Sequence, residues 1–181
     1  TVLPASVLNC KTDTVQLNVQ AANPLNRLIY SWTSPSGGIQ SKPNVNGVKV
    51  NKPGWYYLTV IDTINKCKST DSVLVIEDRT IPGIRVLNPL ELTCTRKTIQ
   101  LEGILTNSGT NYILEWTTSN GNIASMPGNL NIDVTSEGRY YIKVTNLLNG
   151  CLNQDSVDVL ENKNVPTDFQ YLIQQPKCQG E

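Results

Sequence analysis

The sequence has no histidine, one phenylalanine and one methionine among its 181 residues. Without histidine it lacks Ser-His-Asp and Cys-His catalytic groups and every histidine-bearing metal site. Fifteen basic and fifteen acidic residues give zero net charge, which disfavours binding nucleic acid or an anionic membrane by bulk electrostatics. No apolar run approaches the roughly 20 residues that span a bilayer. We expect a soluble segment of a longer precursor that is not an enzyme and carries no cofactor.

What the sequence does contain is an internal repeat. The stretch GWYYLTV at residues 54–60 recurs as GRYYIKV at residues 138–144, an offset of 84 residues (138 minus 54). At this offset residues 1–77 align with residues 85–161 without a gap, and 27 of the 77 pairs are identical. Such self-similarity at a fixed period indicates two copies of one structural module.

The repeat also sets the expected domain organisation. It predicts module 1 at residues 1–80, module 2 at residues 81–164, and the truncated start of a third repeat at residues 165–181, where Cys178 aligns with Cys94. Both ends of the sequence fall inside repeats, so we expect this chain to be a segment of a longer array of repeats. The linkers at residues 77–82 and 161–166 are short, contain proline and lack Gly/Ser runs, which favours a semi-rigid joint and an extended rod.

Within each copy, short alternating segments recur about every ten residues. In the first copy they cover residues 2–8, 14–20, 27–33, 39–41, 46–51, 54–60 and 69–76, separated by Gly, Pro, Asn and Asp turns. Trp32 lies in the third of these segments, and Trp116 is its equivalent in the second copy. Alternation along the strand places both side chains on the inward face. No segment has a helical period. The pattern predicts an all-β chain of tandem immunoglobulin-like Greek-key sandwiches.

The two faces of the aromatic strand have different expected roles. Tyr56 and Tyr140 point inward after a glycine, which suits a tyrosine corner; the alternative is a large half-buried strand residue. Trp55, Tyr57 and Tyr141 have the outward parity. They form a candidate contact surface for a sugar ring or another protein, and the alternative is ordinary exposed surface.

The cysteines predict disulfides and therefore export from the cytosol. Cys10 and Cys67 are 57 residues apart, as are Cys94 and Cys151, and no close cysteine pair suggests zinc. We expect pairing within each module, because the loop before the last strand lies at the pole away from the next module. This requires Cys10 to lie within the first strand region. The alternative joins Cys67 to Cys94 and Cys151 to Cys178.

Few carboxylates recur between the copies. Asp71 and Asp155 precede the core residues of the last strand, where an aspartate most often accepts hydrogen bonds from local backbone amides. The pair Glu77-Asp78 lies at the joint. It could contribute to calcium binding between modules, and the alternative is a solvated joint, since its second-copy equivalent ends in asparagine and calcium takes six to eight oxygen ligands.

Several motifs together carry a family resemblance. They are Tyr-Ser-Trp at residues 30–32, the Gly-x-Tyr-Tyr strand, Asn-Gly-Cys at residues 149–151 and Asp-Ser-Val at residues 71–73. The chain resembles the PKD-like and SprB-like immunoglobulin-type repeats of Bacteroidetes cell-surface proteins. The resemblance covers both copies and the truncated third repeat at residues 165–181. The acidic turn of typical PKD domains is replaced at residues 34–38 and 119–122, so no functional residue is transferred.

The resemblance implies a large repetitive adhesin or surface filament, exported to the cell surface, often by type IX secretion, and used in attachment or gliding motility. We expect this chain to act as an extended stalk whose partners are neighbouring repeats of the same chain, with surface glycans or proteins as further candidates. The alternatives are a carbohydrate- or protein-binding module acting through its exposed aromatics, or an accessory region of an exported enzyme.

Overall fold

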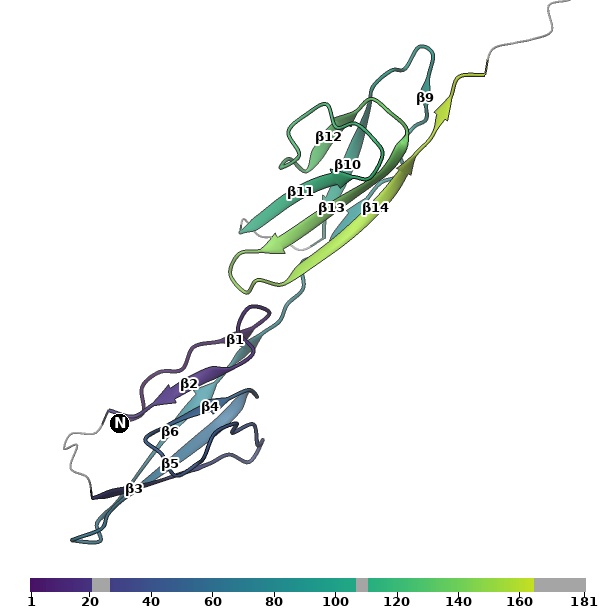
Figure 1. Ribbon diagram of the computed structural model, residues 1–181. Helices are drawn as coiled ribbons and strands as arrows, with labels where there is room; N and C mark the ends of the chain where they lie inside the picture. The colour runs from purple at the N-terminus through teal and green to yellow at the C-terminus, as the bar shows by residue number, and fades with distance from the viewer. Residues whose placement is uncertain (21–26, 107–110, 165–181) are drawn as a thin grey trace, which may run out of the picture.

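The computed structural model describes residues 1–20, 27–106 and 111–164, and these residues form strands and no helix. The predicted start of a third repeat at residues 165–181, with Cys178, lies outside the described residues. Two β-sandwiches lie end to end (Figure 1), so the described chain is a short rod. No helix in the described part of the chain is able to span a membrane.

Each copy contains an equivalent series of strands. In module 1 they are β1 (Leu8–Asn9), β2 (Val15–Asn18), β3 (Leu28–Thr33), β4 (Gly47–Val50), β5 (Gly54–Asp62), β6 (Lys68–Val75) and β7 (Glu77–Asp78). In module 2 they are β8 (Ile84–Val86), β9 (Leu92–Thr93), β10 (Ile99–Leu105), β11 (Tyr112–Thr118), β12 (Asn131–Val134), β13 (Gly138–Asn146), β14 (Leu152–Val159) and β15 (Glu161–Asn162).

The strand order identifies the fold. Module 2 has one antiparallel sheet ordered β8-β10-β12 and another ordered β11-β13-β14. Module 1 repeats this with β2-β4 and β3-β5-β6, and a single Val2–Val19 bridge replaces the β8–β10 pairing. Successive strands change sheets in a Greek-key order that matches the A-B-E and C-F-G sheets of an immunoglobulin domain. Both modules are immunoglobulin-like sandwiches, as the sequence predicted.

A short parallel pairing follows the first strand in each copy. β1 lies parallel to β7, with the Leu8 amide donating to the Ile76 carbonyl (3.0 Å), and β9 lies parallel to β15 in the same way. β7 and β15 continue the last long strand toward the C-terminal pole of their module. The residues just after β1 and β9 are therefore brought to that pole, which in module 1 is the pole close to module 2 (Figure 1).

Every buried core residue of module 1 has a buried equivalent in module 2. Module 1 buries Leu8, Val15, Leu17, Trp32, Val48, Val50, Tyr56, Leu58 and Val75, and every equivalent at the 84-residue offset is buried in module 2. The indole N–H of each core tryptophan donates to a loop carbonyl at 3.1 Å, Val45 for Trp32 and Asn129 for Trp116. The inward parity predicted from the sequence is confirmed in both copies.

Tyr56 and Tyr140 form tyrosine corners. Each ring is fully buried, and each hydroxyl donates at 2.8 Å to a carbonyl four residues upstream, Lys52 or Ser136. The Tyr140 hydroxyl also accepts the backbone N–H of Asn122 at 2.9 Å. The hydroxyl thus ties the turn before the strand to the opposite loop, and this reading holds over that of a merely half-buried strand residue.

The tyrosine corner gives a first testable prediction. Tyr140→Phe keeps the buried ring but leaves the Asn122 amide and the Ser136 carbonyl without this partner. We expect a loss of about 1–3 kcal/mol in the free energy of unfolding, measured by urea denaturation. Tyr141→Phe, on the outer face of the same strand, should change it by less than about 0.5 kcal/mol. Equal effects of the two variants would contradict the assignment.

Candidate functional site

The region that distinguishes this chain from two separate sandwiches is the joint between the modules. It is built from the turn after β1, the segment between β7 and β8, and the loop between β13 and β14 (Figure 1). The first two belong to the C-terminal pole of module 1, and the loop belongs to the N-terminal pole of module 2. Elements from both copies therefore contribute to one interface.

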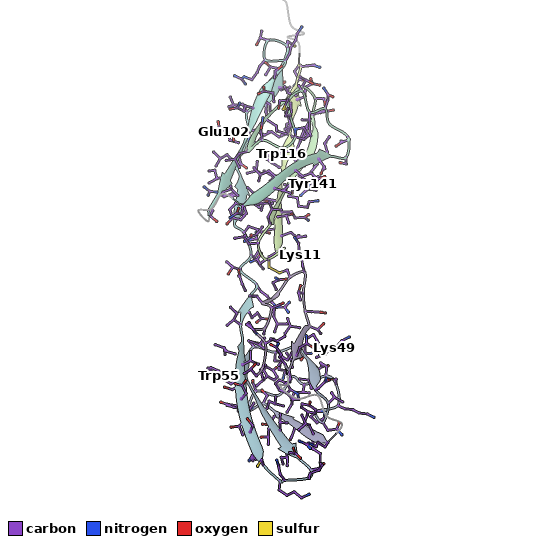
Figure 2. All side chains as sticks on the ribbon, turned by 90° about the vertical axis from the view of Figure 1, so that its left-hand side faces the viewer. Lys11, Lys49, Trp55, Glu102, Trp116 and Tyr141 are labelled. Carbon is purple, nitrogen blue, oxygen red and sulfur yellow. A yellow bond between two sulfur atoms is a disulfide. The ribbon has the colours of Figure 1, made fainter. Side chains whose placement is uncertain are left out.

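A disulfide between Cys10 and Cys151 crosses this joint. Its Cα atoms are 5.0 Å apart, within the range that a disulfide spans, and the bond closes a sequence separation of 141 residues. Figure 2 shows the sulfur–sulfur bond beside Lys11, at the waist between the sandwiches. The Cys10 amide also donates to the Asn149 carbonyl at 3.1 Å. A covalent bond and a backbone hydrogen bond thus join the same two loops.

Both pairings considered from the sequence are wrong. Cys10 does not bond Cys67, Cys94 does not bond Cys151, and the pairing of Cys67 with Cys94 does not occur: both are free and exposed. The physical reason is the β1–β7 pairing, which carries Cys10 to the C-terminal pole, whereas Cys67 lies in the β5–β6 loop at the opposite pole. Because Cys151 bonds Cys10, it is not available to Cys178.

Asn149 is the buried polar residue of the joint, with 1% of its surface exposed. Its side-chain amide donates to Asp78 Oδ1 (3.1 Å) and to the Thr80 carbonyl (3.0 Å), both in module 1. Its Oδ1 accepts the backbone N–H of Cys151 at 2.9 Å. One side chain therefore shapes the cysteine loop of module 2 and holds the linker of module 1. From the sequence, Asn-Gly-Cys at residues 149–151 was only a family motif, and it predicted no role for Asn149 in the joint.

A glycine allows the loop to approach Lys11 closely. Gly150 has a φ of +72°, and a Cβ atom there would lie 2.2 Å from Lys11 Cγ. A side chain at this position would therefore displace the methylene stem of Lys11. A further hydrogen bond runs from the side-chain amide of Asn153 to the Pro82 carbonyl of the linker at 3.0 Å. The cysteine loop of module 2 is therefore closely packed against Lys11 of module 1.

The acidic residues at the joint have protein partners. Asp78 Oδ1 accepts the Thr80 N–H at 3.0 Å as well as the Asn149 amide, and these bonds, that of Thr80 first, lower the pKa of Asp78. Glu77 forms an ion pair with Arg79. Among the described residues no cluster of three or more His, Cys, Asp or Glu side chains is arranged to hold a metal ion. The acidic linker residues thus contact Thr80, Asn149 and Arg79.

Asp71 and Asp155 fasten the first strand to the last. Oδ2 of each accepts a first-strand amide, from Val2 at 2.7 Å and Val86 at 2.8 Å, while Oδ1 of each accepts the next residue's amide at 2.8 Å. The predicted backbone bonding is confirmed, but one bond in each pair spans 69 residues of sequence instead of being local. These carboxylates hold the sandwich together.

Acid should weaken this fastening. The Val2 amide, followed by the Ser72 amide, lowers the pKa of Asp71 below its ordinary value of 3.8. A carboxyl whose pKa is lowered by folding contributes stability that is complete above pH 3.8 and is lost as the pH falls through the folded-state value. Asp71→Asn should therefore flatten the acid limb of stability against pH below about 4, measured by thermal unfolding from pH 2 to 7. An unchanged acid limb would contradict this role.

The outer faces of the C-F-G sheets differ between the copies. Trp55 is 48% exposed and lies opposite Leu74, which is 44% exposed. The equivalent pair in module 2 is Arg139 and Asp158, an exposed ion pair at 3.8 Å. The predicted exposure of Trp55 is confirmed, and module 1 thus has an apolar pair where module 2 has a charged one.

The other two predicted contact residues are less alike. Tyr57 is 44% exposed and lies on the same face as Trp55. Tyr141 is partly buried, with the Arg139 guanidinium 5.9 Å from the centre of its ring. Trp55 and Tyr57 in module 1 are therefore more exposed than Tyr141 in module 2, and a contact role for any of the three stays a prediction.

Comparison with known proteins adds little to these observations. No protein-family model matches the sequence, and no curated protein is significantly similar to it. Among solved structures, the three N-terminal domains of the outer capsid protein Hoc of bacteriophage RB49 align over 89% of this chain and 59% of that one, with 15% identity and a TM-score of 0.47. Extracellular domains 3–5 of Drosophila OTK align over 90% and 61%, with 12% identity and a TM-score of 0.44.

This chain thus spans about three fifths of each of those structures. The fold assignment given above depends on strand order and core packing within the chain itself.

Proposed function

We propose that this chain is a stalk segment of an extracellular, repetitive surface adhesin or filament, in which stiffly joined immunoglobulin-like modules space or display a binding region. The observation that carries this proposal is the joint, where a disulfide, the Asn149 hydrogen bonds and close packing at Gly150 hold the sandwiches end to end. A disulfide also favours an oxidising, exported setting. The resemblance to PKD-like and SprB-like repeats supports a bacterial cell surface and a role in attachment or gliding.

Small-angle X-ray scattering tests the stalk role directly. A stalk segment should behave in solution as one elongated body, so the scattering of the oxidised chain should fit a single end-to-end arrangement. Scattering that requires a broad ensemble of bent and extended forms would overturn the proposal. The same measurement after reduction shows how much of the stiffness the disulfide supplies.

A second candidate function is contact through the apolar face of module 1. The observation that favours it is the exposed Trp55–Leu74 pair, whose module 2 equivalent is the charged pair Arg139–Asp158. A glycan array and a pull-down with the chain would test it. Saturable binding that Trp55→Ala abolishes and Arg139→Ala leaves intact would establish a binding module instead of a pure spacer.

A further inference from the structure

Among the described residues, two exposed thiols lie at the outer poles of the rod. Cys67 is in the β5–β6 loop at the free pole of module 1, and Cys94 follows β9 at the free pole of module 2 (Figure 1). At the 84-residue offset, Cys67 is equivalent to Cys151 and Cys94 to Cys10. Each free thiol is therefore the counterpart of one half of the disulfide already formed at the joint.

The loop that carries Cys67 already has the shape of its bonded counterpart. Asn65 Oδ1 accepts the Cys67 N–H at 2.8 Å, as Asn149 does for Cys151 at 2.9 Å. Lys66 has a φ of +62°, close to the +72° of Gly150 and rare for a residue with a side chain. The loop therefore adopts the bridging conformation with no module in front of it, and Asn65 is exposed where Asn149 is buried.

The segment that carries Cys94 likewise repeats the other half of the joint. Thr93 ends β9 and its amide donates to the Arg96 carbonyl (3.0 Å), matching the Asn9–Thr12 bond (2.8 Å) next to Cys10. Asn162 Oδ1 accepts the Asn164 amide, as Asp78 accepts that of Thr80. Beside Cys94 the surface has a hollow of about 190 Å³, lined by Thr93, Cys94, Lys97, Thr135, Glu161 and Lys163.

The residues next to the cysteines are complementary in size. At the existing joint a long side chain, Lys11, lies over Gly150. At the free poles the long side chain is Lys66, and the position equivalent to Lys11 holds the shorter Thr95. A joint that brought these poles together would again place one long side chain against a small one.

We propose that Cys67 and Cys94 each form an inter-module disulfide equivalent to Cys10–Cys151, Cys67 with a preceding module and Cys94 with a following one. Each module of the array is then disulfide-bonded to both of its neighbours. Cys67 bonds the cysteine of a preceding module that follows the strand equivalent to β1 and β9. Cys94 takes the cysteine of an Asn-x-Cys loop in a following module, 141 residues further along the chain as for Cys10 and Cys151. Each bond forms from two thiols, whose two electrons and two protons pass to a disulfide oxidant.

This inference rests on the proposal that the chain is a run of such modules, and not on any adhesive role. The proposed pairing differs from disulfides within each module, because no disulfide joins two cysteines of the same module. The disulfides would instead run along the rod and stiffen successive joints.

A fusion of two copies of the chain, joined in register with the repeat, tests the proposed disulfide between Cys94 of one copy and Cys67 of the next. Residue 168 aligns with residue 84 (84 plus 84), so residues 1–168 followed directly by residues 1–181 continue the repeat. Cys67→Ser in the first copy and Cys94→Ser and Cys178→Ser in the second leave one Cys94 and one Cys67, beside the two Cys10–Cys151 pairs. The protein is oxidised with a glutathione redox buffer and digested without reduction.

We expect mass spectrometry to find Cys94 joined to Cys67 within one molecule, both Cys10–Cys151 bonds retained and no free thiol. Free Cys94 and Cys67 beside intact Cys10–Cys151 bonds would overturn the inference, as would bonds between molecules or exchange with Cys10 or Cys151. The control is Asn65→Ala in the second copy, which should slow bond formation several-fold. Small-angle scattering of the unfused chain tests the stalk role separately, so failure of one proposal is distinguishable from failure of the other.

Discussion

Removing the Cys10–Cys151 disulfide should convert the rod into a hinged pair of modules. The bond closes a loop of 141 residues, for which the loop-entropy model gives about 5 kcal/mol of stabilisation. For the double variant Cys10→Ser with Cys151→Ala we expect a loss of about 3–5 kcal/mol in the free energy of unfolding, with both sandwiches still folded around their own cores. Denaturation with guanidinium, with and without reductant, measures the loss.

The hinge itself is measurable through the exposed thiols of Cys67 and Cys94. Fluorophores on Cys67 and Cys94, in a Cys178→Ser background, report the separation of the outer poles by single-molecule energy transfer. The bonded protein should give one narrow distribution, and the double variant a broad one. The matched controls are Cys67→Ser and Cys94→Ser, which should change the unfolding free energy by less than about 0.5 kcal/mol. Unchanged stability and an unchanged distribution in the double variant would show that the bond does not hold the joint.

Asn149→Ala should produce the second large effect, because one amide serves both sides of the joint. The substitution leaves the buried Cys151 N–H without its acceptor and frees Asp78 and the Thr80 carbonyl. We expect a loss of about 2–3 kcal/mol in the free energy of unfolding, measured by urea denaturation of the oxidised protein. The matched control is Asn65→Ala, which removes the same loop bond where no second module is present and should cost about 1 kcal/mol or less.

A charge variant sharpens this test. Asn149→Asp keeps an oxygen for the Cys151 N–H but places a carboxylate against Asp78 Oδ1, which the amide contacts at 3.1 Å. We expect Asn149→Asp to be less stable than Asn149→Ala at pH 7 and to recover as the pH falls, because protonation of either carboxyl relieves the repulsion. Equal stability of Asn149→Ala and Asn65→Ala would show that the joint contacts contribute nothing.

The sequence determined most of the module. Alternation along strands such as β5 and β13 follows from a sheet with one buried face, so Tyr56, Leu58, Tyr140 and Ile142 were assigned inward correctly. The 84-residue offset then transferred each core position from one copy to the other. The tyrosine corner was one of two readings, because parity places the ring but only the fold brings a carbonyl to its hydroxyl.

The outer sheet face was predictable in position but not in detail. Parity placed Trp55 and Arg139 outward, and both lie there. It did not show that the Arg139 guanidinium lies over the Tyr141 ring, 5.9 Å from its centre, because side-chain packing across an exposed face depends on the neighbours that pairing brings together. The more exposed aromatic side chains, Trp55 and Tyr57, therefore lie in module 1.

The joint was decided by tertiary structure alone. Identical spacing of cysteines in two copies shows which cysteines are equivalent, but not whether they bond within one copy or between copies. A disulfide needs Cα atoms within about 7 Å of each other, and only the fold sets that distance. The parallel β1–β7 pairing brings Cys10 to one pole of module 1, and the β13–β14 loop brings Cys151 to the facing pole of module 2. The sequence by itself therefore defined a repeating sandwich. Only strand pairing in three dimensions determined that the cysteines join modules to one another.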